Sequence, residues 1–372
     1  MKIDRIELYV VQNRFWRPWR TAYGSDAFNR VLMARMVSGE HEGWSESSPL
    51  GAPTYCYEYA DGAFEIARDF LAPALIGQDI GSARELNERL VHYKGNPFAK
   101  AAVEMAWWTL AADCEGKTLG QMIGNTPGEI EVGEGFGIAD SFDDLIKDIG
   151  GAFDKGYSRV KLKMAHGWDI EMLKAVRSTF PTQRFHVDAN SSYDPSDPED
   201  LAILKQVDKF GLAMIEQPFR VGDIYSAAKF QQQIDTPICL DESIFDVWQA
   251  EQAAELKACG YINIKPARVG GIQNSLDINR ICEQAGIGCW IGGMMESDVG
   301  KSMCVEMAAL SNMVYPHDVT PSVENYPEVF TDSVLEWSSP CHFHTSERVG
   351  TPIRPDMLKM REKIAKSAIV GE

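Results

Sequence analysis

Apolar and polar positions follow two different patterns along the chain, and the change falls near Pro127. Residues 1–55 carry loosely alternating apolar positions, which predict strands. Residues 57–124 combine helical apolar spacing with many strong helix formers, which predicts helices. The N-terminal third is therefore expected to contain strands followed by helices.

Beyond Pro127, short apolar runs alternate with segments of helical spacing. The runs predicted as strands are residues 130–138, 159–164, 184–190, 213–219, 237–243, 261–266 and 288–294. The segments predicted as helices include residues 170–180, 201–210, 247–258 and 276–285. Repeated strand–helix units with apolar strands are typical of a parallel sheet covered by helices. Seven runs favour a closed barrel over an open sheet.

Charged residues stand near the ends of five consecutive runs, inside otherwise apolar sequence. They are Lys161 and Lys163, Asp188, Glu216, Asp241 and Lys265. A single Asp at a strand end is usually a helix cap or a loop anchor. One or two charges on each of five neighbouring strands, all at one rim, are hard to explain as solvated surface. Because function concentrates at the C-terminal ends of barrel strands, we expect a functional site there.

The types of charge at this rim indicate a metal and a base. Three carboxylates repel one another unless a cation joins them. All-oxygen ligation suits Mg²⁺, with Mn²⁺ as an alternative, so Asp188, Glu216 and Asp241 are the predicted ligands. Lys161 and Lys163 lie two apart on one strand and project to the same side. Lysines near one another and near a metal can have a lowered pKa, which a general base needs.

The amino-acid composition limits the classes of molecule that the chain is expected to bind. The 54 Asp and Glu residues against 36 Lys and Arg give a net charge of −18, which argues against nucleic acid and anionic membranes. A small carboxylate substrate remains compatible with a locally positive site. We see no signal peptide and no apolar run of membrane-spanning length. The eight cysteines form no C-x-x-C pair, so we expect reduced thiols in a cytoplasmic protein, and we expect a homo-oligomer.

The ordered motifs resemble the enolase superfamily in its muconate-cycloisomerase-like subgroup, and most closely the o-succinylbenzoate synthase and N-acylamino acid racemase family. They are K-x-K at 161–163, D-A-N at 188–190, I-E-Q-P at 215–218, L-D-E-S at 240–243 and N-I-K-P at 263–266. Longer matches are INIKPARVGG at 262–271 and WIGGMMES at 290–297. The sequence departs from the family pattern at Ala267, at Asp298 and over 316–330, near the expected substrate pocket.

The resemblance implies a fold and its domains. It implies a (β/α)₇β modified TIM barrel over residues 126–330. An α+β capping domain of residues 1–125, completed by a tail from about 331 to 372, would close over the barrel. The loop 15–24 would then fold over the active site, although the same residues also suit an exposed hairpin tip.

The resemblance also implies roles for single residues. Lys163 is the expected base, Lys161 assists it, and Lys265 faces the other side of the substrate. Asn190, Glu242 and Arg268 would orient ligands and lysines, although Arg268 also suits a surface salt bridge. The expected substrate contacts are Trp19, Tyr23, Met294, Glu296 and Ser297. His186 is expected in the core, whereas His166 could touch substrate.

The implied reaction is Mg²⁺-dependent removal of a proton α to a carboxylate, through an enolate. The leading interpretation is an o-succinylbenzoate synthase, a dehydrating lyase of menaquinone biosynthesis. The alternative is a racemase of N-acylamino acids such as N-succinylamino acids, followed by a muconate cycloisomerase or a dipeptide epimerase. An interpretation from a different class is a non-catalytic barrel that retains a metal site.

Overall fold

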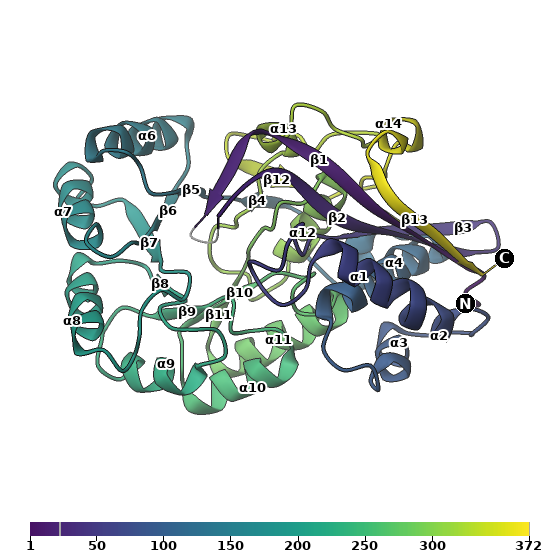
Figure 1. Cartoon of the computed structure of the whole chain (residues 1–372), viewed down its shortest axis with the longest axis horizontal. Helices are drawn as coiled ribbons and strands as arrows, with labels where there is room; N and C mark the ends of the chain where they lie inside the picture. The colour runs from purple at the N-terminus through teal and green to yellow at the C-terminus, as the bar shows by residue number, and fades with distance from the viewer. Residues whose placement is uncertain (22–23, 372) are drawn as a thin grey trace.

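Two large sheets of opposite kind organise the chain, which we describe from a computed structural model covering residues 1–21 and 24–371 (Figure 1). The first is a four-stranded antiparallel sheet with the strand order β13-β1-β2-β3. The second is a seven-stranded parallel sheet with the order β11-β10-β9-β8-β7-β6-β5. A short two-stranded sheet joins β12 to β4.

The antiparallel sheet joins the two ends of the chain. Its strands are β1 (Arg5–Thr21), β2 (Gly24–Ser38), β3 (His41–Ser47) and β13 (Ile364–Gly371). Strands β1 and β2 form a long hairpin, and β13 pairs with β1 on its other edge. In Figure 1 the far end of this hairpin reaches toward β5 and β6. The loop expected at 15–24 is thus largely the end of the hairpin.

Strand β3 lies within the region predicted as strands, but its bounds were not predicted, because its buried residues are mostly polar. The hydroxyl of Ser45 donates to the Ala102 carbonyl, and that of Ser47 donates to the Phe98 carbonyl at 2.8 Å. Both acceptors lie on α4 (Pro97–Glu115), which packs across this strand. A Cβ on Gly43 would lie 2.1 Å from the Leu110 nitrogen, so only glycine allows this close approach.

The remaining helices before the barrel are short. They are α1 (Ala60–Ile66), the π-helical turn η1 (Ala67–Leu71), α2 (Ala72–Leu75), α3 (Ala83–Leu90) and α5 (Leu119–Ile123). Helix α4 is buried on nearly all sides, as its continuous run of apolar and small residues requires.

The parallel sheet confirms the predicted barrel, although its strands are shorter than the apolar runs. They are β5 (Glu134–Phe136), β6 (Arg159–Lys163), β7 (Arg184–Asp188), β8 (Ile215–Glu216), β9 (Ile238–Leu240), β10 (Tyr261–Ile264) and β11 (Gly288–Ile291). The first run is divided into β4 (Glu129–Glu131) and β5, and β4 pairs antiparallel with β12 (His342–His344).

Segment 312–318 takes the eighth strand position and closes the barrel through backbone hydrogen bonds on both sides. Toward β11, the Asp318 N–H donates to the Ile291 carbonyl at 2.9 Å. Toward β4, the His317 N–H donates to the Glu131 carbonyl at 3.0 Å. The barrel is therefore a ring of eight strand positions, in which β6 and β10 stand opposite each other.

Helices follow the strands and cover the outside of the barrel (Figure 1). They are α6 (Phe142–Lys155), α7 (Asp169–Thr179), α8 (Pro198–Val207) with the 3₁₀ turn η2 (Asp208–Phe210), α9 (Ile224–Gln231), α10 (Val247–Leu256), α11 (Ile272–Ala285) and α12 (Asp298–Ala308). Two short helices, α13 (Ser322–Asn325) and α14 (Met357–Arg361), lie beyond the barrel's last strand. The domain limits at about residues 125 and 331 stay a prediction.

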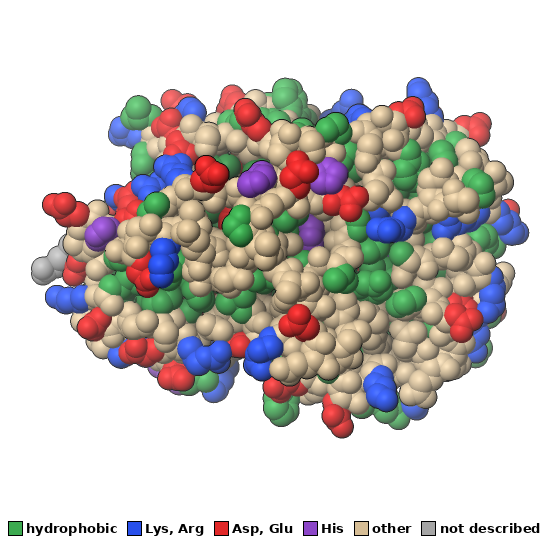
Figure 2. Space-filling view, turned by 180° about the vertical axis from the view of Figure 1, so that it is seen from behind, with side chains coloured by type: hydrophobic (Ala, Val, Ile, Leu, Met, Phe, Trp, Pro, Cys, Tyr) green, Lys and Arg blue, Asp and Glu red, His purple; other side chains and the backbone are tan. Residues whose placement is uncertain are grey.

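The surface mixes charges of both signs. Acidic side chains are interspersed with lysines and arginines on the face in Figure 2. Within the described residues, the search for a helix with the length and apolar character of a membrane span finds none. All eight cysteines are free thiols.

Buried carboxylates join the N-terminal part of the chain to the barrel. Glu104 on α4 accepts hydrogen bonds from the N–H groups of Ile272 and Gln273, both at 2.8 Å, at the start of α11. Glu46 on β3 does the same at α12, where it accepts from the N–H groups of Ser297 and Gly300. A carboxylate at a helix N-terminus satisfies unpaired N–H groups and complements the helix dipole.

The first prediction concerns Glu104. Replacing Glu104 with Ala leaves the two α11 N–H groups and the Trp108 indole N–H, which also donates to Glu104, without their acceptor. We expect urea denaturation to show a loss of about 3 kcal/mol in the free energy of unfolding. The exposed Glu171 on α7 is the control, and Glu171→Ala should change it by less than about 0.5 kcal/mol. A Glu104→Ala variant as stable as the wild type would contradict the capping role.

The second prediction is a pH dependence. Burial raises the pKa of Glu104 to about 7, although the N–H groups of Gln273 and Ile272 lower it. Because the pKa is higher in the folded than in the unfolded state, protonation of this carboxyl adds stability that is full below about pH 4.5 and is lost as the pH rises through 7, whereas its capping hydrogen bonds remain. The unfolding free energy of the wild type minus that of Glu104→Gln should therefore fall between pH 5 and pH 8. A difference that stays constant or grows would refute this assignment.

Candidate active site

The barrel brings the predicted charged residues to one rim. Lys161 and Lys163 lie on β6, Asp188 ends β7 and Glu216 ends β8. Asp241 directly follows β9, and Lys265 directly follows β10. Because these strands are parallel, all six side chains belong to the same end of the barrel.

At this rim each lysine is paired with carboxylates. Lys163 Nζ lies 2.6 Å from Asp188 Oδ2 and also donates to Asn190 Oδ1. Lys265 Nζ lies 3.0 Å from Asp241 Oδ2. Lys161 Nζ stands 3.8 Å from both Asp188 and Glu216. Positive and negative groups thus alternate, which allows all of them to be buried or half-buried.

Sequence reasoning missed two residues of this network. Asp318, on the segment that closes the barrel, forms ion pairs with Lys161 and, at 2.7 Å, with Arg159. Tyr55, from the loop after β3, places its hydroxyl 3.3 Å from Lys265 Nζ. Neither residue ends a regular apolar run, so the strand-end pattern could not indicate them.

These neighbours raise the pKa of two of the lysines. Burial alone would lower the pKa of Lys161, but Asp318, Glu216 and Asp188 raise it above its ordinary value. Burial would also lower the pKa of Lys265, whereas Tyr55 and Glu242 raise it. Carboxylates and the Tyr55 hydroxyl are close neighbours of these two lysines, whereas the lowered pKa expected beside a metal stays a prediction.

The carboxylates suit a divalent cation in their chemistry, but their present arrangement does not form a metal site. In the described part of the chain, no three His, Cys, Asp or Glu side chains are grouped so as to hold a metal ion. Asp188, Glu216 and Asp241 are all buried, and among the described residues none completes a hydrogen bond to Oε2 of Glu216, although His186 Nε2 lies 3.3 Å away. A buried carboxylate oxygen without a donor is costly unless a cation or a donor meets it. This donor set therefore fits Mg²⁺ or Mn²⁺.

The predicted supporting residues lie around this network. Asn190 donates from Nδ2 to Glu242 Oε1 at 2.9 Å, and its own N–H donates to Asp188 Oδ1. Arg268 is fully buried, which excludes the alternative of a surface salt bridge. It forms an ion pair with Asp241 and lies 3.2 Å from the Tyr55 hydroxyl.

The expected substrate residues on the C-terminal side of β11 are engaged in buried hydrogen bonds. Glu296 accepts from the Met294 N–H at 2.9 Å, and Ser297 caps α12 and contacts Glu46. Met294, Glu296 and Ser297 are all buried. The side chain of Trp19 and the whole of Tyr23 lie outside the described residues.

The hairpin end contacts the segment after the barrel. The Trp16 indole donates to the Val323 carbonyl at 2.9 Å, and Phe15 stacks on Tyr326 with ring centroids 5.2 Å apart. His166 Nε2 lies 2.8 Å from Oδ1 of Asp200 on α8. His186 is buried in the core, as expected.

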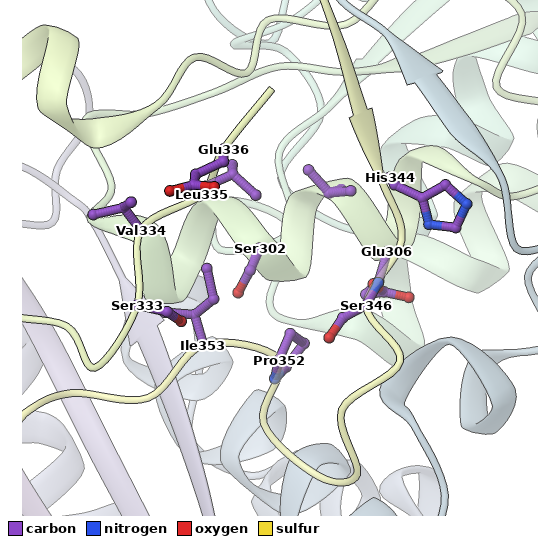
Figure 3. Close-up of a pocket in the computed structure, with 11 residues that line it drawn as sticks. Ser302, Glu306, Ser333, Val334, Leu335, Glu336, His344, Ser346, Pro352 and Ile353 are labelled. Carbon is purple, nitrogen blue, oxygen red and sulfur yellow. The ribbon is translucent and has the colours of Figure 1, made fainter. Parts of the chain in front are cut away.

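A separate cavity of about 240 Å³ lies away from the rim (Figure 3). It is bounded by α12, by residues 333–336 and by the segment from His344 to Ile353. None of the predicted site residues lines it.

Comparison with known proteins gives consistent matches over both parts of the chain. Residues 5–124 match the mandelate racemase / muconate lactonizing enzyme N-terminal domain, and residues 144–357 match the enolase C-terminal domain-like family. The chain is 36% identical to an N-succinylamino acid racemase from Thermus thermophilus, covering 90% of each. It is 34% identical to an o-succinylbenzoate synthase from Bacillus subtilis, covering 88% of each.

A solved structure has the same fold over the whole chain. An enolase-superfamily member from Listeria innocua superposes with a TM-score of 0.95 at 32% identity, over 100% of this chain and 99% of the other. The two domain matches, the barrel with its rim of lysines and carboxylates, and these relatives together identify the chain as a member of the enolase superfamily, close to the o-succinylbenzoate synthases and N-succinylamino acid racemases, and as a lyase or isomerase.

Proposed function

We propose that the chain removes a proton α to the carboxylate of a small substrate, and that its main reaction is the dehydration that forms o-succinylbenzoate. The observation that carries this proposal is a difference between two lysines that stand on opposite sides of the barrel. Relatives at about the same identity bear both candidate names, so the choice between reactions depends on the site itself.

The two lysines are placed to act on opposite faces of one substrate. Lys163 ends β6 and Lys265 follows β10, and these strands are four positions apart in the ring of eight. A planar enolate held between them presents one face to each lysine. A reaction at one face needs one base, whereas racemisation needs proton transfer at both faces.

The surroundings of the two lysines differ. The Lys163 side chain is 34% exposed, and that of Lys265 is 11% exposed. Tyr55 covers Lys265, with Nζ 5.0 Å from the ring centroid, and Asp241 accepts a hydrogen bond of 3.0 Å from the same Nζ. Lys163 is thus the accessible base and Lys265 a fixed positive charge, an arrangement that supports a one-base dehydration.

Asp188, Glu216 and Asp241 would hold the cation, for which we propose Mg²⁺, with Mn²⁺ as an alternative. When bound, it supplies positive charge against the second negative charge that forms on the substrate carboxylate. A ligand role for these carboxylates also requires them to leave their lysine partners, which frees Lys163 Nζ from Asp188.

The chain's own residues then account for the proton movements. Lys163 takes the α-proton, and the positive charge of Lys265 stabilises the enolate from the other face. Lys163 returns the proton to the departing hydroxide, so that one water leaves and the aromatic ring forms. Asn190 orients Lys163, and Tyr55 keeps Lys265 in place.

Racemisation of N-succinylamino acids is the second candidate. It is favoured by the presence of a lysine on each side of the site and by the similarity to the Thermus racemase. In that reaction Lys163 and Lys265 would each exchange the proton of one enantiomer.

The third prediction separates these reactions. For dehydration of a succinyl-hydroxycyclohexadiene carboxylate, Lys163→Ala should lower turnover by roughly 10²–10⁴-fold and abolish α-proton exchange in D₂O. Lys265→Ala should slow turnover but keep the exchange catalysed by Lys163. Lys174→Ala, on the exposed surface of α7, is the control and should match the wild type.

The same variants are then tested with both enantiomers of an N-succinylamino acid by NMR. If the chain racemises, each lysine variant should keep exchange of only one enantiomer. If both variants exchange both enantiomers at wild-type rates, neither lysine is the base and the mechanism is wrong.

A further inference from the structure

His186 lies one layer below the predicted metal ligands. It precedes Asp188 by two residues on β7, so both side chains point to the interior of the barrel. In the sheet it pairs with Lys161 of β6, just as Asp188 pairs with Lys163. Its side chain is completely buried. His186 therefore faces the underside of the charged rim.

Two polar groups meet the imidazole ring, one at each nitrogen. Nδ1 lies 3.0 Å from the Tyr315 hydroxyl, and Nε2 lies 3.3 Å from Glu216 Oε2. Tyr315 belongs to the segment that closes the barrel, and Glu216 ends β8. All three residues are buried, so water does not compete for these contacts.

The chemistry of the three groups assigns the proton to one nitrogen of the imidazole ring. An ionised carboxylate only accepts, so the proton of a neutral imidazole belongs on Nε2, facing Glu216. Nδ1 then carries a lone pair and accepts from the Tyr315 hydroxyl. The Tyr315 hydroxyl thus donates to His186, and the Nε2–H of His186 faces Glu216 Oε2 at 3.3 Å.

Packing fixes the ring in this orientation. Trp290 and Tyr315 both contact the imidazole edge to face, each with centroids 5.5 Å away. Arg159 in turn stacks over both of those aromatic rings. The position of His186 is therefore set by residues from three other strand positions of the barrel.

The two oxygens of Glu216 are held unequally. Oε1 accepts a hydrogen bond of 2.7 Å from Asn263 Nδ2. Among the residues that the structure describes, no donor completes a hydrogen bond to Oε2, which His186 approaches at 3.3 Å. The imidazole is the group placed to fix the plane of this carboxylate from below.

We propose that His186, oriented by Tyr315, is a positioning residue for the Glu216 carboxylate and thereby sets the affinity of the chain for its divalent cation. This inference rests on the proposed function, in which Glu216 is a metal ligand. Groups that hydrogen-bond to metal-ligating carboxylates restrict their orientation, and their loss commonly weakens metal binding about 10–100-fold.

The experiment is titration calorimetry of the full chain with MgCl₂ alone, so the readout is metal affinity rather than turnover. We expect His186→Phe, which keeps an aromatic ring but no nitrogen, to weaken binding about 10–100-fold. The Mg²⁺ affinities of His186→Gln, which restores a donor, and of Tyr315→Phe should lie between those of His186→Phe and the wild type. Tyr261→Phe, in the same aromatic layer but without contact to His186, is the matched control and should bind as the wild type does.

Glu216→Gln distinguishes the proposed metal site from the positioning role of His186. If Glu216→Gln loses Mg²⁺ binding while His186→Phe binds like the wild type, the positioning role is overturned and the metal site stands. If Glu216→Gln binds Mg²⁺ unchanged, the proposed metal site fails and this inference fails with it. If His186→Phe does not fold, Tyr315→Phe decides, because an unchanged affinity in that variant overturns the proposal.

Discussion

Charges buried together at one end of a closed barrel are the constraint on which this structure depends. Carboxylates from β7, from β8 and from the end of β9 would repel one another without compensating charge. Lysines from β6 and from the end of β10 supply that charge, so each carboxylate at the ends of β7 and β9 is neutralised by a lysine from the neighbouring strand. Closure by segment 312–318 adds Asp318 between Arg159 and Lys161 and completes the alternation of signs.

Buried carboxylates also join the N-terminal part of the chain to the barrel. Glu104 and Glu46 place carboxylates on the first turns of α11 and α12, which lead away from the rim. The loop after β3 also reaches the rim, where the Tyr55 hydroxyl lies 3.3 Å from Lys265 Nζ. Burying an acidic group at a helix start thus connects the two parts of the chain as well as stabilising the helix start.

The barrel and most of its rim could be predicted from the sequence because both are periodic. Apolar runs mark the strands, and a charge at the end of each run, as at Asp188 or Lys265, marks the rim. The bounds of β3 escaped prediction because its serines are satisfied by α4, a contact that no local pattern records. Asp318 and Tyr55 escaped for the same reason, since tertiary contacts alone bring them to the lysines. The raised pKa of Lys265 likewise follows from neighbours distant in sequence.

The central claim is that the rim carboxylates exchange their lysine partners for a divalent cation, which frees Lys163 to act as the base. A crystal structure with Mn²⁺, measured at the manganese absorption edge, tests this most directly. The account predicts one anomalous peak between Asp188, Glu216 and Asp241, with Lys163 Nζ no longer in contact with Asp188. Saturating Mn²⁺ without a peak at this position, and with the 2.6 Å contact between Lys163 and Asp188 retained, would contradict it.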